Sequence, residues 1–147
     1  MSDEAPSDAR RANAGSLHPA LDDAEKERLF QLGVELFDQG RYFDAHEPWE
    51  LIWRSRNPEP RDLYQGLVQV AAGFHHWFDR GRAAPAARLL ERGARRLGAG
   101  EVAAARAPGL ATIELSAFVA QLGVWRAWLA RGEGDLPSRP RLRRARR

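Results

Sequence analysis

The chain has 147 residues, of which 44% are hydrophobic and 29% are charged. These proportions are typical of one globular domain with a hydrophobic core. The sequence contains no cysteine, which excludes disulfides, thiolate metal ligands and cysteine nucleophiles.

The sequence has no apolar run near the roughly 18 to 20 residues that a membrane helix requires. Its first residues, MSDEAPSDARR, are polar and acidic and do not resemble a secretory signal. We therefore predict a cytoplasmic protein that does not cross a membrane.

The net charge of +3 is unevenly distributed. The segment from Leu136 to Arg147 has no acidic residue and contains Arg139, Arg141, Arg143, Arg144, Arg146 and Arg147. Without this segment the chain would carry a net negative charge. Such a segment can hold phosphates, but no aromatic residue is interleaved with the arginines. We predict a disordered basic tail over 133–147, and nucleic-acid binding, if any, through this tail alone.

Residues 1–20 lack periodicity and are predicted to be disordered. The first helix should begin after Asp22, which can cap it with Glu25 three positions later. Gly40 is a natural left-handed stop. The apolar stripe of this helix consists of Leu29, Leu32, Val34, Leu36 and Phe37.

The second helix is predicted over Phe43 to Arg56 and contains HEPWELIW, residues 46–53. Pro48 lies near its start, where a missing N–H costs little, whereas deeper in the helix it would remove one hydrogen bond. The sequence Asn57-Pro58-Glu59-Pro60 then breaks the chain.

The third predicted helix, Arg61 to Arg80, is apolar around much of its circumference, which is typical of a central helix. Gly66 and Gly73 lie seven positions apart on one side. Each costs about 1 kcal/mol relative to alanine, so we expect close helix packing as compensation. Gly81 should end this helix.

Two further helices are predicted, over Ala84 to Leu97 and Thr112 to Ala130, and no segment shows the alternation of a strand. A weak internal repeat aligns FDQGRYFDAHEPWE (37–50) with FDRGRAAPAARLLE (78–91). The repeat favours two helix-Gly-helix hairpins, weakly tetratricopeptide-like. The sequence thus predicts an all-α fold, a compact bundle of about five helices in a single domain over 21–132.

Polar residues could converge between the second and third helices. His46, Glu50 and Trp53 share one helical face at i, i+4 and i+7. Gln65, Gln69 and His76 share a face of the third helix, and His75 is displaced from it by about 100°. If the two helices pack together, these side chains could meet.

One interpretation of this cluster is chemical. His46, Glu50 and His76 could bind a divalent metal with one open coordination position, with Gln65 and Gln69 behind them. His46 and Glu50 could instead act as an oriented acid–base pair.

The other interpretation is a buried hydrogen-bond network. Glu50 would accept from an imidazole or from the Trp53 indole, and the two glutamines would satisfy one another. The residue types alone leave both interpretations open.

The spacing His46-x-x-x-Glu50-x-x-Trp53 resembles the HxxxExxW signature of the DUF309 family, small helical proteins of unknown function. Residues 40–47 (GRYFDAHE) and 64–77 (YQGLVQVAAGFHHW) resemble two further parts of that family's pattern, and the resemblance covers about residues 28–97. It implies an all-helical domain and marks His46, Glu50 and Trp53 as signature positions, but it implies no reaction.

Three hypotheses for function follow. The first is a polar ligand or metal site, with no enzyme class assigned, for which the candidate residues are His46, Glu47, Glu50, Trp53, Tyr64, Gln65, Gln69, His75 and His76. The second is a non-catalytic interaction module that binds another protein or forms a homodimer, with the cluster acting as a structural clamp. The third is nucleic-acid binding through the basic tail.

Overall fold

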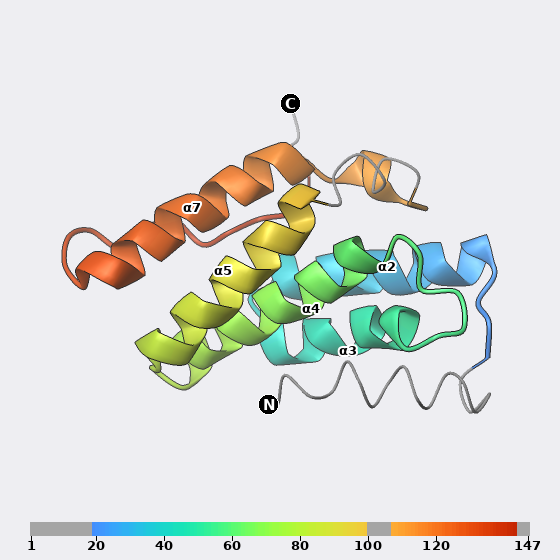
Figure 1. Cartoon of the computed structure of the whole chain (residues 1–147), viewed down its shortest axis with the longest axis horizontal. Coiled ribbons are helices and arrows are strands. Elements are labelled where there is room, and N and C mark those ends of the chain that lie inside the picture. Colours follow the sequence, from blue (N-terminus) through green and yellow to red (C-terminus); the bar gives the residue numbers. More distant parts are fainter. Residues whose placement is uncertain (1–18, 100–106, 144–147) are drawn as a thin grey trace.

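The computed structural model describes residues 19–99 and 107–143, which form five α-helices (Figure 1). These are α2 (Asp23–Asp38), α3 (Tyr42–Trp53), α4 (Arg61–Phe74), α5 (Ala83–Ala99) and α7 (Leu115–Arg131). A π-helical turn, η1 (His75–Asp79), continues α4, and a 3₁₀ turn, η2 (Leu110–Thr112), precedes α7. One isolated β-bridge is present and the described residues contain no strand, so the all-α prediction is confirmed.

The helix boundaries follow local signals in the sequence. Asp22 caps α2 by accepting a hydrogen bond of 2.8 Å from the Glu25 amide. Gly40 and Gly81 both adopt positive φ, at 81° and 64°, and each turns the chain between two helices. The internal repeat therefore corresponds to two hairpins, α2–α3 and α4–α5.

Helix α3 is shorter than predicted and ends at Trp53. Pro48 lies well inside it rather than in its first turn, so the Asp44 carbonyl loses its usual helical donor. The third helix keeps α-geometry only to Phe74 and becomes π-helical over the next five residues.

Helix α4 is central, as predicted, and packs against both α3 and α5. The close contact between α4 and α5 is possible because glycines face each other there. A Cβ atom at Gly66 would lie 3.1 Å from the Gly93 carbonyl oxygen, and a Cβ at Gly93 would lie 2.9 Å from the Gly66 carbonyl oxygen. The backbones of α4 and α5 therefore touch directly, which is the compensation that the sequence led us to expect.

The contact between α2 and α3 depends on a similar fit. The Trp49 indole is fully buried and lies where a side chain at Gly33 would be. Its Nε1 donates to the Phe30 carbonyl at 3.2 Å. One tryptophan of HEPWELIW is thus a packing residue that joins two helices.

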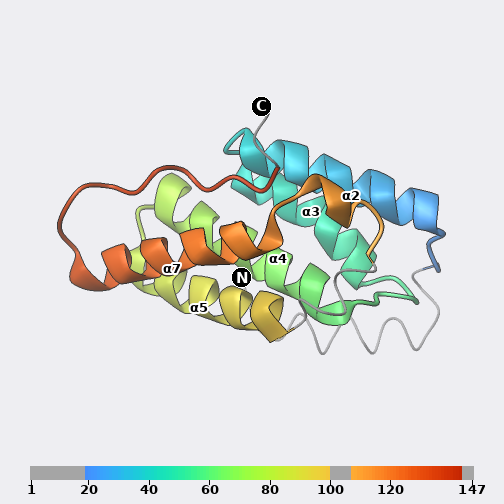
Figure 2. The same ribbon diagram turned by 90° about the horizontal axis from the view of Figure 1, so that it is seen from above.

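Residues 133–143, here called the C-terminal strap, run back along α7 toward the end of α2 (Figure 2). The composition favoured a disordered tail from residue 133, and the structure differs. The Trp125 indole donates to the Ser138 carbonyl at 2.9 Å. The Asp38 carboxylate accepts from the amides of Leu142 and Arg143 at 2.8 and 3.1 Å, and the Leu142 side chain is fully buried.

Arg139 of the strap contacts the aromatic core. Its guanidinium donates to the Tyr42 hydroxyl at 3.1 Å and lies 4.0 Å from the centre of the Phe78 ring. Burial raises the pKa of the Tyr42 hydroxyl, and Arg139 partly opposes this effect. Tyr42 is therefore neutral at ordinary pH and accepts from the arginine.

The disorder predicted for residues 1–18 and 144–147 lies outside the described residues. Within the described ranges, no helix combines the length and the apolar character needed to span a bilayer.

Candidate ligand-binding site

Helix α3 and the turn η1 bring two predicted histidines to one surface, on either side of an aromatic ring. The Phe43 ring centre lies 4.9 Å from that of His46 and 5.1 Å from that of His75. Phe43 is 49% exposed, whereas the side chains of His46 and His75 are 13% and 18% exposed. We call these three residues the imidazole face. An exposed phenyl ring is thus held between two imidazoles that are mostly covered.

The hydrogen bonds of both imidazoles define their tautomers. His46 Nδ1 contacts the Phe43 carbonyl oxygen, and His75 Nδ1 lies 2.7 Å from Asp79 Oδ2. A carbonyl and a carboxylate only accept, so Nδ1 carries the proton in both rings. In its neutral form, each ring then keeps the lone pair on Nε2 for an acceptor or base role.

The better imidazole–carboxylate pair is not the predicted one. His46 Nε2 lies 3.9 Å from Glu50 Oε1, beyond hydrogen-bonding distance, and Glu50 also faces the Arg54 guanidinium at 4.0 Å. By contrast, His75 and Asp79 are directly hydrogen-bonded. This second pair lies on the π-helical turn, and such turns are frequent at functional sites.

His76 lies next to this pair, with its ring centre 5.9 Å from that of His75, and lines a hollow beside α5. Its Nδ1 is buried and has no hydrogen-bond partner among the described residues. Burial lowers the pKa of His76, and the nearby His75, Arg82 and Arg80 lower it further. His76 is therefore neutral at physiological pH.

The remaining predicted residues do not join the imidazole face. Trp53, Tyr64 and Gln65 are buried in the interior, and Glu47 is exposed. Burial raises the pKa of Tyr64 to about 12. Its hydroxyl therefore stays protonated and does not serve as a base.

The predicted buried network does not form among these side chains. The Trp53 indole nitrogen, the Tyr64 hydroxyl and the Gln69 carbonyl oxygen are buried without partners among the described residues. Glu50 consequently does not accept from Trp53, and the glutamine carbonyl is not satisfied by its neighbour.

The predicted metal-ligand set of His46, Glu50 and His76 does not converge either. Within the part of the chain that the structure describes, no group of three or more histidine or acidic side chains could hold a metal ion. The three side chains do not meet because Glu50 and His76 have different neighbours. Glu50 faces His46 and Arg54, whereas His76 lies at the hollow beside α5.

Two site residues were missed by sequence reasoning, Phe43 and Asp79. Asp79 could have been predicted from the sequence, because it lies four positions after His75, the same spacing that paired His46 with Glu50. Phe43 gave no such signal, because its position between the imidazoles depends on how α3 packs on the end of α4.

Residues 30–89 match the family model of DUF309, a domain of unknown function. The DUF309 resemblance is confirmed over this segment. It extends from α2 to the first turns of α5, so Phe43, His46, Glu50, His75 and Asp79 all lie inside the DUF309 segment. The C-terminal strap and the last arginines of α5 lie outside it. No curated protein and no solved structure shows significant similarity to the chain.

Proposed function

We propose that the imidazole face binds a small polar ligand that carries a flat group, with the His75–Asp79 pair serving as an oriented proton acceptor. The observation that supports this is the exposed Phe43 ring, held between two imidazoles whose tautomers are fixed by acceptors. The proposal keeps the predicted ligand site but moves its centre from the His46–Glu50 pair to Phe43 and His75.

The chemistry of the face suggests the kind of ligand. The Phe43 ring offers an apolar surface on which a flat group can stack. The two Nε2 atoms are acceptors, so they favour hydroxyl, amine or N–H groups on the ligand. Asp79 holds the Nδ1 proton of His75 and would stabilise the imidazolium if His75 takes a proton from the ligand.

The tryptophan end of HEPWELIW has a different role in this proposal. Trp49 and Trp53 are buried, so they hold α3 in place while Phe43 remains exposed beside the partly covered His46. The clamp hypothesis then applies to the tryptophans, and the ligand hypothesis applies to the preceding residues.

A fragment screen followed by histidine and aromatic NMR shifts would test the proposal. We expect flat compounds with N–H or O–H groups to shift the His46 and His75 ring signals. Phe43→Ala should abolish these shifts. Leu51→Ala is the matched control, because Leu51 is a similarly exposed apolar residue of α3, at 56%, and has no aromatic ring on which a flat group could stack.

Asp79→Asn would test the proton-acceptor role separately. With an amide in place of the carboxylate, the Nδ1–H tautomer of His75 should no longer be fixed, and nitrogen shifts of the ring report this directly. The proposal fails if no fragment shifts either ring, or if Phe43→Ala and Leu51→Ala behave alike.

A further inference from the structure

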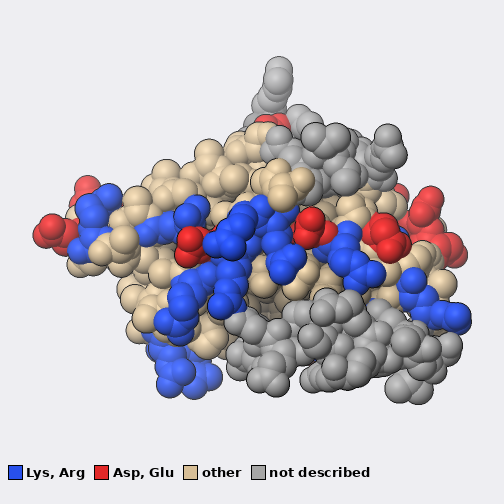
Figure 3. Space-filling view, viewed as in Figure 1, with Lys and Arg blue, Asp and Glu red and all other residues tan. Residues whose placement is uncertain are grey.

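The exposed side of α5 is rich in arginine. Residues 80–99 contain a single carboxylate, Glu91, against the arginines Arg80, Arg82, Arg88, Arg92, Arg95 and Arg96. In Figure 3, Lys and Arg side chains gather in a band over α5 on the face shown. We call Arg82, Arg88, Arg92, Arg95 and Arg96 the arginine face. The composition had pointed only to the C-terminal segment as basic.

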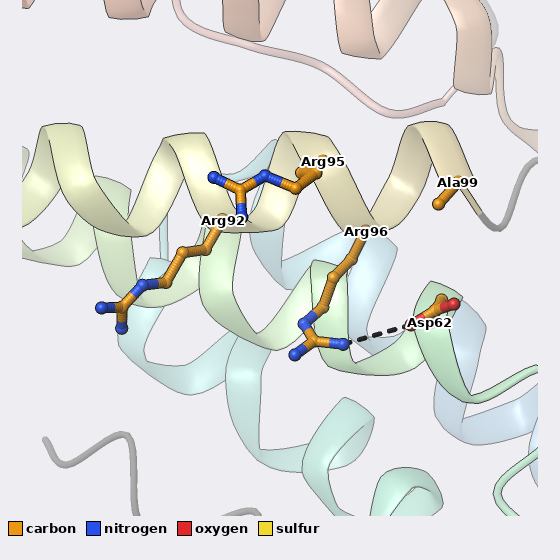
Figure 4. Close-up of a pocket in the computed structure, with 5 residues that line it drawn as sticks. All are labelled: Asp62, Arg92, Arg95, Arg96 and Ala99. Carbon is orange, nitrogen blue, oxygen red and sulfur yellow. Dashed lines mark hydrogen bonds and ion pairs between the residues drawn. The ribbon is translucent and has the colours of Figure 1, made fainter.

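Two neighbouring hollows lie along this face. One, of about 610 Å³, is lined by His76, Arg82, Arg88 and Arg92 among others. The second, of about 350 Å³, is lined by Asp62, Arg92, Arg95, Arg96 and Ala99 (Figure 4). Arg92 borders both hollows, so they form one extended basic surface along the helix.

The arginines of this face are only partly neutralised. Arg96 bonds Asp62 at 3.2 Å, and Arg95 lies 3.5 Å from Glu91. Both pairs are exposed, and exposed ion pairs contribute little to stability, so they can exchange for another anion. Arg82 and Arg88 have no carboxylate partner among the described residues.

The spacing of the arginines suits a row of phosphates. Arg88, Arg92 and Arg96 follow one another at four-residue intervals, so their Cα atoms lie about 6 Å apart along one side of the helix. A guanidinium binds phosphate oxygens through two parallel N–H donors, which makes arginine well suited to this ligand. Each strand of a duplex presents one phosphate per roughly 3.4 Å of axis, so alternate phosphates repeat at about 6.8 Å, close to the spacing of these arginines.

We propose that the arginine face binds the phosphate backbone of a double-stranded nucleic acid without reading its sequence. This proposal goes beyond the ligand site, and neither depends on the other.

Two features favour a duplex over other polyanions. Among the described residues, the large exposed apolar side chains are Leu32, Phe43, Leu51, Val124 and Leu136, and none lies on α5. The apolar side chains of the larger hollow are Ala83, Ala84, Pro85 and the partly buried Leu89, so the face offers little apolar surface to enter a membrane. No Phe, Tyr or Trp lines either hollow, so the face lacks the stacking platform that single strands use.

Fluorescence anisotropy with a labelled DNA duplex of mixed sequence, about 20 base pairs long, would test the proposal on the full chain. We expect binding at about 50 mM NaCl that weakens steeply by about 200 mM. Arg82→Gln with Arg88→Gln should weaken binding roughly tenfold at the lower salt and make the slope of log K against log salt shallower by about 2.

The matched control is Arg28→Gln with Arg41→Gln. This variant loses the same charge from exposed positions outside α5, each of which has only an exposed ion pair. Its affinity for the duplex should stay within about twofold of the wild-type value, because Arg28 and Arg41 lie outside the arginine face and would make no phosphate contact. Thermal melts of both double variants would verify that the fold is intact.

Four results would overturn the proposal. The duplex could fail to bind at the lower salt, or both double variants could lose affinity equally, which would indicate a general charge effect. Deleting residues 144–147 could abolish binding while the Arg82/Arg88 variant binds normally, which would assign binding to the tail. Finally, vesicles containing phosphatidylserine could bind in an Arg82/Arg88-dependent way while the duplex does not, which would identify a membrane surface instead.

Discussion

The C-terminal strap and helix α5 both carry several arginines, but their guanidinium groups have different neighbours. Arg139 of the strap donates to the Tyr42 hydroxyl and lies over the Phe78 ring. Arg82 and Arg88 line an open hollow and have no carboxylate partner among the described residues. Composition cannot separate an arginine that anchors a chain from one that is available to a partner. The atoms around each guanidinium make that distinction.

The largest effect is expected when the strap is detached from the core. Leu142 is fully buried, so Leu142→Ala should lower the free energy of unfolding by about 3 kcal/mol, as expected for a buried leucine. Chemical denaturation measures the loss. Leu136→Ala is the control within the same strap, because Leu136 is 55% exposed. If the two variants were equally stable, residues 133–143 would not be packed as described.

A smaller loss of stability should distinguish an arginine that anchors the strap from an arginine of the arginine face. Arg139→Gln removes a hydrogen bond and a cation–π contact, so we expect a loss of about 1 to 2 kcal/mol. Arg88→Gln should change stability by less than about 0.5 kcal/mol, because an exposed residue without partners contributes little. Parallel urea titrations would check both values. A stability loss in Arg88→Gln as large as that in Arg139→Gln would contradict the assignment.

The smallest effect concerns pH. Burial, followed by His75 and the arginines, lowers the pKa of His76 in the folded state. The unfolded chain therefore takes up a proton at this position at higher pH than the folded chain does. Stability should fall as the pH drops through about 6.5, the unperturbed value. His76→Gln should remove this part of the acid sensitivity.

Arg82→Gln refines the pH experiment, because it takes away one of the positive charges near His76. The decline of stability with acidity should then be shallower than in the wild type but should not vanish, since burial is the larger cause. An Arg82→Gln variant with the same pH dependence as wild type would show that the arginine face does not influence this histidine.

Much of the fold was predictable because its signals are local. The Asp22 cap, the glycine turns at 40 and 81 and the apolar character of residues 61–74 each act within a few residues. The packing role of Gly66 could also be predicted, because a glycine inside a central helix lowers helix stability and close packing can offset that loss.

The strap and the site were harder to predict because they depend on distant residues. Residues 133–143 look unstructured alone, and they are ordered by Asp38 and Trp125, far away in the sequence. The sequence grouped His46 with His76 and set His75 apart from them, whereas in the structure His75 reaches the Phe43 ring that His46 also contacts, and His76 lines the hollow beside α5. The π-helical turn sets these directions, and no sequence signal was found for it.

The reciprocal contact of Gly66 and Gly93 has a mechanical consequence. With backbone against backbone, a side chain at either glycine would push α5 away from α4. Since η1 continues α4, such a shift would also change where His75 lies relative to the arginines of α5. The Gly66–Gly93 contact therefore sets the spacing between the imidazole face and the arginine face.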